Sequence, residues 1–288
     1  MTVRIGINGF GRIGRLVLRA LIENGRDDLV PVAIDDLGPI EANAHLFSYD
    51  SVHGRFPGQM AIEGDALTIR LQGRSYGPIR VSAEKDPTKV PFHGVDVAME
   101  CTGHFTKKET ASQLLTAGAR KVLVSAPAAG ADATIVYGVN EKTMTRDMTV
   151  GSNASCTTNC LGPMVKALHD AFGVLSGYMV TIHSYTGDQH TIDTLHKDSR
   201  RARAAALSMI PTSTGAARSG DTGAQGQARW DRHPGADAQR VAGFSRFGSE
   251  NAGDGAADQR CDEGRQPREA SWHSGVQYRA AGQHRLQS

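Results

Sequence analysis

The chain has 288 residues, of which 39% are hydrophobic and 22% are charged, and its formal net charge is +2. This length allows one large domain or two ordinary ones, and so small a charge argues against nucleic acid or an anionic membrane as the main partner. The start of the chain lacks the layout of a signal peptide, and no run of about 18 apolar residues occurs. The 4 cysteines are scattered, which favours a reducing compartment, so we expect a soluble, cytoplasmic protein.

Short apolar runs alternate with helix-like runs along most of the chain. The expected strands cover residues 3–8, 30–35, 95–101, 121–126, 133–138 and 177–186. The expected helices, in which apolar residues recur at a helical period, cover residues 12–25, 109–119 and 156–173. Strands that alternate with helices predict an α/β fold built on a parallel sheet.

The composition changes at about residue 219. Residues 219–288 contain no Lys, Ile or Met and a single Leu, Leu286, and they show no apolar periodicity. Such a segment has little apolar surface to bury against the entropy of ordering it. We therefore expect this segment to be disordered.

The motif GFGRIG, residues 9–14, matches the pattern G-x-G-x-x-G. Alone the pattern is weak, and a plain glycine-rich turn between a strand and a helix is the alternative. Here the motif follows an expected strand and opens an expected helix. The acidic pair Asp35 and Asp36 stands at the end of the next strand, about 20 residues further on. This context predicts a dinucleotide site.

Each glycine of this motif has a physical role in such a site. Gly9 permits the tight turn, Gly11 allows a pyrophosphate to approach, and Gly14 allows the helix to pack closely. The helix N-terminus supplies amide donors and the positive end of a dipole. An acidic side chain at the end of the next strand accepts ribose hydroxyls and repels a 2′-phosphate, so we expect NAD rather than NADP as the cofactor.

A second motif, SNASCTTNC at residues 152–160, surrounds a cysteine with hydroxyl groups. Cys156 is expected at the start of a helix, where the N-terminus stabilises a thiolate, the nucleophilic form of cysteine. A buried structural cysteine is the alternative, but the polar neighbourhood favours the nucleophile. Cys160 is interpreted as structural or as a redox neighbour, because two cysteines without further ligands make a poor zinc site.

Two further features suit the same chemistry. His183 follows an apolar strand, where a neutral imidazole could take a thiol proton and later return one; a hydrogen-bonded core histidine is the alternative. Hydroxyls and small residues that suit a phosphate oxyanion stand at Ser155, Thr157, Thr186, Thr214 and Gly215. Taken singly, each of these is most often a cap or a turn residue.

Together these motifs resemble the glyceraldehyde-3-phosphate dehydrogenase family in order and spacing. The matching segments, within residues 1 to about 218, are INGFGRIGR, YDSVHGRF, SAPA, SNASCTTNCL, TIHSYTGDQ, HKDSRRARAAALSMIP and TSTGAA. The resemblance implies oxidation of glyceraldehyde 3-phosphate with NAD and inorganic phosphate to 1,3-bisphosphoglycerate, through a thioester on Cys156. It leaves open whether the reaction serves glycolysis and glucose metabolism, gluconeogenesis or the Calvin cycle.

The resemblance also implies roles for single residues. His183 activates Cys156 as its base. Positions that hold the substrate phosphate or the attacking phosphate are Ser155, Thr157, Thr186, Thr214 and Gly215. Positions that contact the cofactor are Gly9, Gly11, Arg12, Ile13, Gly14, Asp36, Lys85, Thr102 and Ser125. Residues after Thr186 through Met209 resemble the loop at the family's subunit interface, which implies a homotetramer.

The implied organisation is a Rossmann NAD-binding domain over residues 1–152, then an α+β catalytic domain over 153–218 that is cut short. Residues 219–288 do not resemble the family, whose later motifs include a phosphate-binding Arg and an Asn and a Tyr beside the nicotinamide. We interpret the change as a reading-frame shift in a GC-rich gene, with a genuine divergent tail as the alternative.

Two other functions stay open. Erythrose-4-phosphate dehydrogenase has the same fold and releases an acid by hydrolysis, so the products from the two sugars would separate the enzymes. The other is an inactive NAD-binding remnant, because the cofactor half is intact and the catalytic half is cut short. Measuring NAD affinity and turnover on the same sample would discriminate between a remnant and an enzyme.

Overall fold

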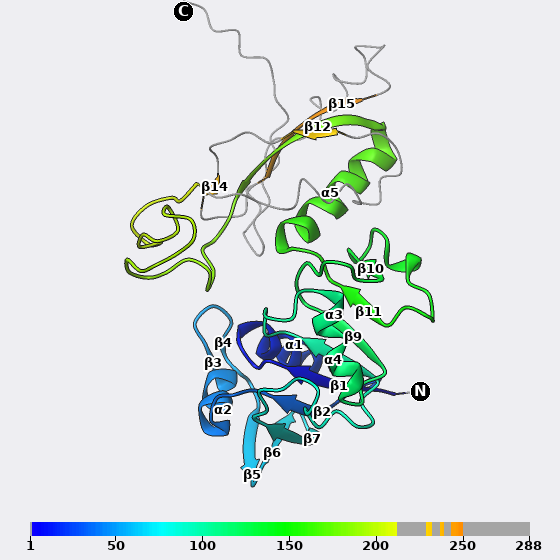
Figure 1. The fold of residues 1–288 in the computed structure, drawn as a ribbon, viewed down its shortest axis with the longest axis vertical. Helices are drawn as coiled ribbons and strands as arrows, with labels where there is room; N and C mark the ends of the chain where they lie inside the picture. The colour runs from blue at the N-terminus through cyan, green and yellow to red at the C-terminus, as the bar shows by residue number, and fades with distance from the viewer. Residues whose placement is uncertain (1, 212–228, 232–236, 239–242, 250–288) are drawn as a thin grey trace, which may run out of the picture. The chain divides into compact units, whose positions relative to one another are not determined.

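The computed structural model describes residues 2–211, 229–231, 237–238 and 243–249. The chain divides into two compact units, Met1–Cys156 and Thr157–Ser288, and each unit contains a β-sheet of its own (Figure 1). The domain limits that the sequence predicts, at residues 152 and 218, stay predictions.

A mixed sheet forms the middle of the first unit. Its described strands are β1 (Val3–Asn8), β2 (Leu29–Asp35), β5 (Gln59–Glu63), β6 (Ala66–Leu71), β7 (Arg74–Ser82), β8 (Val97–Glu100), β9 (Lys121–Val124), β10 (Ala133–Thr134) and β11 (Val150–Ser152). They lie in the order β10-β11-β9-β8-β1-β2-β7-β6-β5. The pairs from β10 to β7 are parallel, whereas β5, β6 and β7 form an antiparallel edge.

The predicted α/β fold is confirmed. The prediction that the sheet is wholly parallel is wrong at the edge formed by β5, β6 and β7. Tight turns connect β5 to β6 and β6 to β7, and a glycine with positive φ stands in each turn, Gly64 at 63° and Gly73 at 78°. Short connections of this kind force antiparallel pairing, because parallel strands need a long crossover.

The described helices of this unit are α1 (Arg12–Glu23), α2 (Ile40–Ser48), α3 (Lys108–Ala111) and α4 (Gln113–Thr116), with a 3-10 turn at Glu141–Thr143. A small hairpin, β3 (Tyr49–Asp50) and β4 (Gly54–Arg55), follows α2. The predicted end of the first helix is confirmed, since Gly25 has a φ of 61° just after α1. The sequence did not predict α2, whose apolar residues are interrupted by Asn43 and His45.

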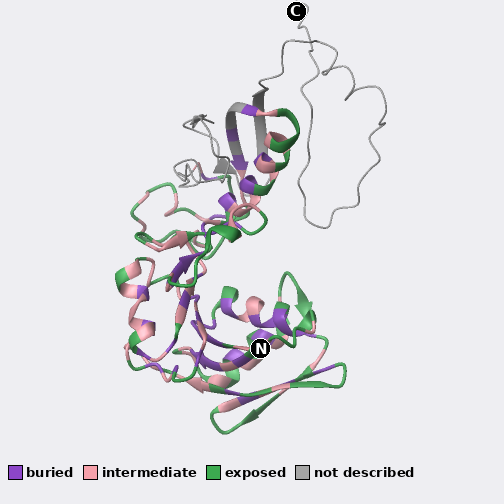
Figure 2. Ribbon diagram, turned by 90° about the vertical axis from the view of Figure 1, so that its right-hand side faces the viewer, coloured by how far each residue is buried: buried purple, intermediate pink, exposed green. Residues whose placement is uncertain are grey.

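Buried side chains pack on both faces of this sheet. Leu18 of α1 packs with Ile7 of β1 in one cluster, and Leu114 of α4 lies in a second. Within β8, Met99 packs against the first cluster and Ala98 lies in the second. Because successive side chains of a strand point to opposite faces, helices cover the sheet on both sides. The buried residues, purple in Figure 2, lie mainly on the central strands of the sheet, whereas β5 at its edge is largely exposed.

The strand predicted at 133–138 is wrong after Thr134. The side chain of Asn140 forms hydrogen bonds with backbone groups of Thr134 and Val136, in place of a neighbouring strand. Its oxygen accepts from the Val136 amide at 2.7 Å, and its nitrogen donates to the Thr134 carbonyl at 2.9 Å. The chain therefore turns at this point.

The single helix predicted at 109–119 is two short helices, α3 and α4. The hydrogen-bond pattern changes between them, because the Leu115 amide donates to the Ser112 carbonyl, three residues back, at 2.9 Å. Gly118, with a φ of 112°, follows and ends the helical segment.

The helix α5 (Cys156–Phe172) begins at the last residue of the first unit, and the rest of it belongs to the second unit together with β12 (Val174–Ile182). Leu161 and Val165 of α5 are buried with Met179 of β12, and Figure 1 shows the helix beside this strand. The strand predicted at 177–186 begins and ends earlier than expected. Gly173 has a φ of 66°, so the helix ends there and the strand follows at once.

Three strands of the C-terminal segment are described: β13 (Arg229–Asp231), β14 (Asp237–Ala238) and β15 (Gly243–Ser249). All three pair with β12, the first two in parallel and β15 antiparallel. The rest of residues 219–288 lies outside the described residues. For that part both disorder and a reading-frame shift stay predictions.

Candidate functional site

The glycine-rich turn after β1 has the geometry that the motif predicts. Gly9 has a φ of 88°, and a Cβ there would lie 2.7 Å from the Thr102 amide nitrogen. A Cβ on Gly14 would lie 2.2 Å from the Gly9 carbonyl oxygen. At Gly11, by contrast, a Cβ would meet no atom within 4 Å. The first and last glycines are thus required by the fold, and the middle one faces open space in which a ligand fits.

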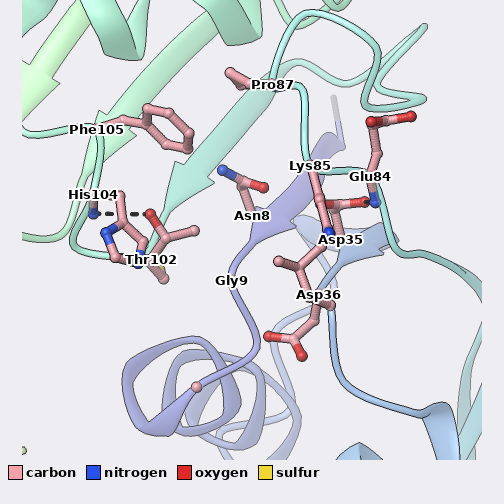
Figure 3. A pocket seen from close by; sticks show the side chains of 13 residues that line it. Asn8, Gly9, Asp35, Asp36, Glu84, Lys85, Pro87, Thr102, His104 and Phe105 are labelled. Atoms are coloured by element: carbon pink, nitrogen blue, oxygen red, sulfur yellow. Dashed lines mark hydrogen bonds between the residues drawn. The ribbon is translucent and has the colours of Figure 1, made fainter.

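A pocket of about 340 Å³ opens beside this turn. It brings together five residues predicted to bind the cofactor: Gly9, Gly11, Asp36, Lys85 and Thr102. The other lining residues are Asn8, Asp35, Leu37, Glu84, Pro87, Cys101, His104 and Phe105. Figure 3 shows them arranged around the carboxyl ends of the parallel strands, where open α/β sheets bind their ligands.

The two acidic residues at the end of β2 differ in their surroundings. Asp36 lies at the glycine turn, where one oxygen accepts from the Phe10 amide at 2.7 Å and the other from the Gly38 amide at 2.9 Å. Asp35 is buried, and it accepts from the Ser82 hydroxyl at 2.6 Å. Burial raises the pKa of Asp35 above its ordinary value. Asp36 is therefore the better placed of the two for a ribose.

The sequence missed several residues of the pocket wall. Asn8 ends β1, Glu84 follows β7, and His104 and Phe105 follow β8. Asn8 lies in the segment INGFGRIGR but was given no role, and the other three belong to no motif. Their common feature is a position at the carboxyl end of a strand, and that feature could have found them once the strand order was known.

Four residues predicted to contact the cofactor are absent from the pocket lining. Arg12 forms an ion pair with Asp50, in which Nη1 lies 2.7 Å from Oδ2. Ile13 is half exposed, and Gly14 is buried in α1. Ser125 follows β9, where its amide donates to the Glu100 carbonyl at 2.9 Å. Their role toward a cofactor stays a prediction.

Cys156 is the first residue of α5 and is exposed, as its predicted role requires. Of its predicted neighbours, Ser155 is half-buried and Thr157 is buried. Cys160 lies one helical turn further on and is half-buried. The helix therefore exposes Cys156 to solvent more than it exposes Cys160.

His183 comes directly after β12 and is half-buried. Its Nδ1 lies 2.6 Å from the Ser184 carbonyl oxygen. Because a carbonyl oxygen only accepts, Nδ1 carries the proton in this contact and Nε2 is the basic nitrogen. His183 and Cys156 belong to different units, and each is described within its own unit.

The predicted phosphate residues are only partly described. Thr186 is exposed at the start of a turn, in which its amide donates to the Gln189 side-chain oxygen at 2.7 Å. Thr214 and Gly215 lie outside the described residues. Whether these positions hold phosphate stays a prediction.

Two other kinds of site are absent from the part of the chain that the structure describes. No described helix has the length and apolar character that crossing a membrane requires. No three side chains among the described His, Cys, Asp and Glu residues form a group that could hold a metal ion.

The fold and the pocket define a dinucleotide-binding protein of the α/β class. Residues 3–108 match the family model of the glyceraldehyde 3-phosphate dehydrogenase NAD binding domain, and residues 155–222 match that of the C-terminal domain. The chain belongs to the glyceraldehyde-3-phosphate dehydrogenase family, so the predicted resemblance is confirmed. NAD is the cofactor that this family model supports.

Relatives with the name glyceraldehyde-3-phosphate dehydrogenase are similar over the same part of the chain. The protein from Xanthobacter flavus is 61% identical over 220 residues, and that from Cereibacter sphaeroides is 63% identical over 218. The protein from Geobacillus stearothermophilus is 52% identical over 221 residues. Each match covers 76% of this chain and 64% of the relative. The chain thus spans just under two thirds of the length of these curated relatives.

Proposed function

We propose that this chain is an NAD-dependent, phosphorylating glyceraldehyde-3-phosphate dehydrogenase. The observation that carries the proposal is the exposed Cys156 at the start of α5, in a chain that also holds a dinucleotide pocket beside Gly11. An exposed thiol at a helix N-terminus is suited to nucleophilic attack, and a dinucleotide site is suited to hydride transfer.

In the proposed reaction, Cys156 Sγ attacks the aldehyde carbon of glyceraldehyde 3-phosphate and forms a thiohemiacetal. NAD, when bound, supplies the acceptor for the hydride that leaves this carbon. The resulting thioester is cleaved by inorganic phosphate, so the products are an acyl phosphate and the regenerated thiolate. Hydroxyls at Ser155, Thr157 and Thr186 would hold the two phosphate groups.

His183 is the proposed base. Its Nδ1 faces the Ser184 carbonyl, so the imidazole is held as the tautomer whose Nε2 accepts a proton. Nε2 would take the proton of the Cys156 thiol during attack, and protonated His183 would then stabilise the developing oxyanion.

We also propose that the protein is a homotetramer and works in the cytoplasm. Apolar side chains in the segment after Thr186 support a subunit interface: Ile192 is 73% exposed, Leu195 is 99% exposed and Leu207 is 87% exposed. Exposed apolar groups that lie close in sequence favour association. Sedimentation equilibrium of the full chain tests this, and a monomer at all concentrations contradicts it.

One preparation of the full chain tests the proposed activity. NAD affinity is measured by calorimetry, and NADH formation is followed by absorbance with glyceraldehyde 3-phosphate and inorganic phosphate. Turnover that depends on phosphate supports the proposal. NAD binding without turnover identifies an inactive remnant, and turnover on erythrose 4-phosphate that does not depend on phosphate identifies the other dehydrogenase.

A further inference from the structure

A buried carboxyl group lies behind the wall of the pocket. Glu100 is the last residue of β8, and only 1% of its surface is exposed. It does not line the pocket itself. A carboxylate at such a position is costly unless hydrogen bonds replace water. The residues that donate hydrogen bonds to Glu100 therefore indicate its role.

Glu100 accepts hydrogen bonds from two residues that do line the pocket. One carboxyl oxygen accepts from the Asn8 side-chain nitrogen at 2.5 Å. The other accepts from the Thr102 amide at 2.8 Å and also from the Thr102 hydroxyl. Asn8 and Glu100 are register partners at the ends of β1 and β8. The carboxylate thus connects the ends of β1 and β8, next to the residue that precedes Gly9.

These contacts fix which atoms the pocket wall presents. A carboxylate only accepts, so the amide of Asn8 must turn its nitrogen toward Glu100 and its oxygen away from it. No described residue donates to that oxygen. The Thr102 hydroxyl donates its proton to Glu100 and accepts from the His104 amide at 3.0 Å. Both side chains therefore offer acceptor oxygens rather than donors.

The position of Asn8 makes this orientation relevant to a ligand. Figure 3 places its side chain between Thr102 on one side and Asp35 on the other, within the pocket. A Cβ on Gly9 would lie 2.7 Å from the Thr102 nitrogen, so the loop after β8 packs tightly against the turn. A shift of Thr102 would change the pocket and the turn together.

We propose that Glu100 is a positioning residue of the cofactor pocket, which holds Asn8 and Thr102 so that their oxygens accept hydrogen bonds from the hydroxyl or amino groups of a dinucleotide. The inference rests on the proposed use of this pocket for NAD. Burial raises the pKa of Glu100 above its ordinary value, and the hydrogen bonds from Thr102 and Asn8 oppose this rise without cancelling it. The donors thus favour the ionised form that the arrangement needs.

The test is a double-variant cycle on the full chain, with NAD affinity measured by calorimetry. In Glu100→Gln, an amide nitrogen replaces one carboxyl oxygen and faces a donor of Asn8 or Thr102, so the pocket wall must rearrange. We expect about tenfold weaker NAD binding for Glu100→Gln and for Asn8→Ala alike. We expect the double variant to lose well under a hundredfold, because the two changes share the contact between Asn8 and Glu100.

Asp132→Asn is the matched control. Asp132 also accepts from backbone amides, those of Thr149 and Val150 at 2.9 Å each, but it lies away from the pocket. Its variant should lower the thermal unfolding midpoint and leave NAD affinity unchanged. If Glu100→Gln does not fold, Glu100→Asp takes its place in the cycle, because it keeps the charge and retracts it by one methylene.

The outcomes separate the two proposals. If the unmodified chain does not bind NAD, the proposed function fails and this inference fails with it. If the unmodified chain binds NAD and the Glu100 variant binds equally well, Glu100 has a structural role only. Losses that multiply to about a hundredfold in the double variant would also overturn the inference, because they would show that Glu100 does not act through Asn8.

Discussion

The backbone amide of Phe10 donates a hydrogen bond of 2.7 Å to the carboxylate of Asp36. Phe10 stands within the glycine turn after β1, and Asp36 follows the end of β2. The second carboxyl oxygen of Asp36 accepts from the Gly38 amide at 2.9 Å and from the Asn43 side chain at 3.1 Å. The residue predicted to bind the ribose therefore also holds the turn predicted to bind the pyrophosphate.

Asp36→Ala should weaken NAD binding by roughly 1.5–3 kcal/mol, since it removes a charge-assisted hydrogen bond to the ribose. The preference for NAD over NADP should narrow as well, because the charge that repels a 2′-phosphate is lost. Calorimetry with both cofactors measures the two effects. The argument from the acidic residue is wrong if NADP binds the unmodified chain as tightly as NAD.

Two alanine substitutions in the glycine turn should differ in their effect on the free energy of unfolding. Gly9→Ala places a Cβ 2.7 Å from the Thr102 nitrogen at a φ of 88°, so the folded state should lose about 1–3 kcal/mol. Gly11→Ala meets no atom within 4 Å, so its unfolding free energy should be within about 0.5 kcal/mol of the parent.

NAD affinity should show an effect of Gly11→Ala that the free energy of unfolding does not show. Gly11→Ala should bind NAD at least about tenfold more weakly, because its methyl group occupies space that the pyrophosphate needs. Urea unfolding and calorimetry on the same samples give both quantities. Unchanged NAD affinity in Gly11→Ala would show that the cofactor does not approach this turn.

Cys156→Ser should abolish dehydrogenase turnover and leave NAD affinity unchanged. A serine hydroxyl is almost never ionised at neutral pH, so the covalent step loses its nucleophile. Cys160→Ser is the matched control, since Cys160 is half-buried one turn further along the same helix, and it should retain most of the turnover. Any turnover by Cys156→Ser above that of a blank would remove Cys156 from its assigned role.

The stability that Asp50 contributes should depend on pH. Its pKa is lowered from 3.8 to about 2, first by the His53 amide and further by the Val52 amide and Arg12. The folded state therefore favours the ionised form, and the stabilisation is complete above about pH 4 and lost as the pH falls toward 2. Asp50→Asn should be less stable than the parent at pH 7 in urea unfolding. The difference should shrink between pH 4 and pH 3, and a constant difference over this range would contradict the assignment.

The sequence predicted those parts of the fold that local pattern determines. The run VRIGIN is a strand and Arg12–Glu23 is a helix, because period, glycine turn and helix stop agree. The prediction at 133–138 failed because Asn140, outside that run, binds its backbone. The antiparallel edge was missed because β5 and β7 are largely exposed and carry many polar residues.

The residues of the cofactor pocket were predictable only where they belong to a sequence motif or to a segment that resembles the family. Gly9, Asp36 and Thr102 were found through motif and resemblance, and the structure brings them to one pocket. Glu84 and Phe105 line the same pocket but were missed, because strand order brings their loops together and no sequence spacing encodes that order. Glu100 was missed for another reason, since its role depends on a hydrogen bond to Asn8, a residue 92 positions away.

Cys101 gives the first unit a chemical reporter of its own unfolding. It is buried at the end of β8, and burial raises its pKa to about 11. At neutral pH an alkylating reagent should therefore modify Cys156 rapidly, while Cys101 stays protected as both a neutral and an inaccessible thiol. The extent of Cys101 alkylation, measured by peptide mass spectrometry after incubation at increasing urea concentrations, would then show at which concentration the sheet opens. No added label is needed.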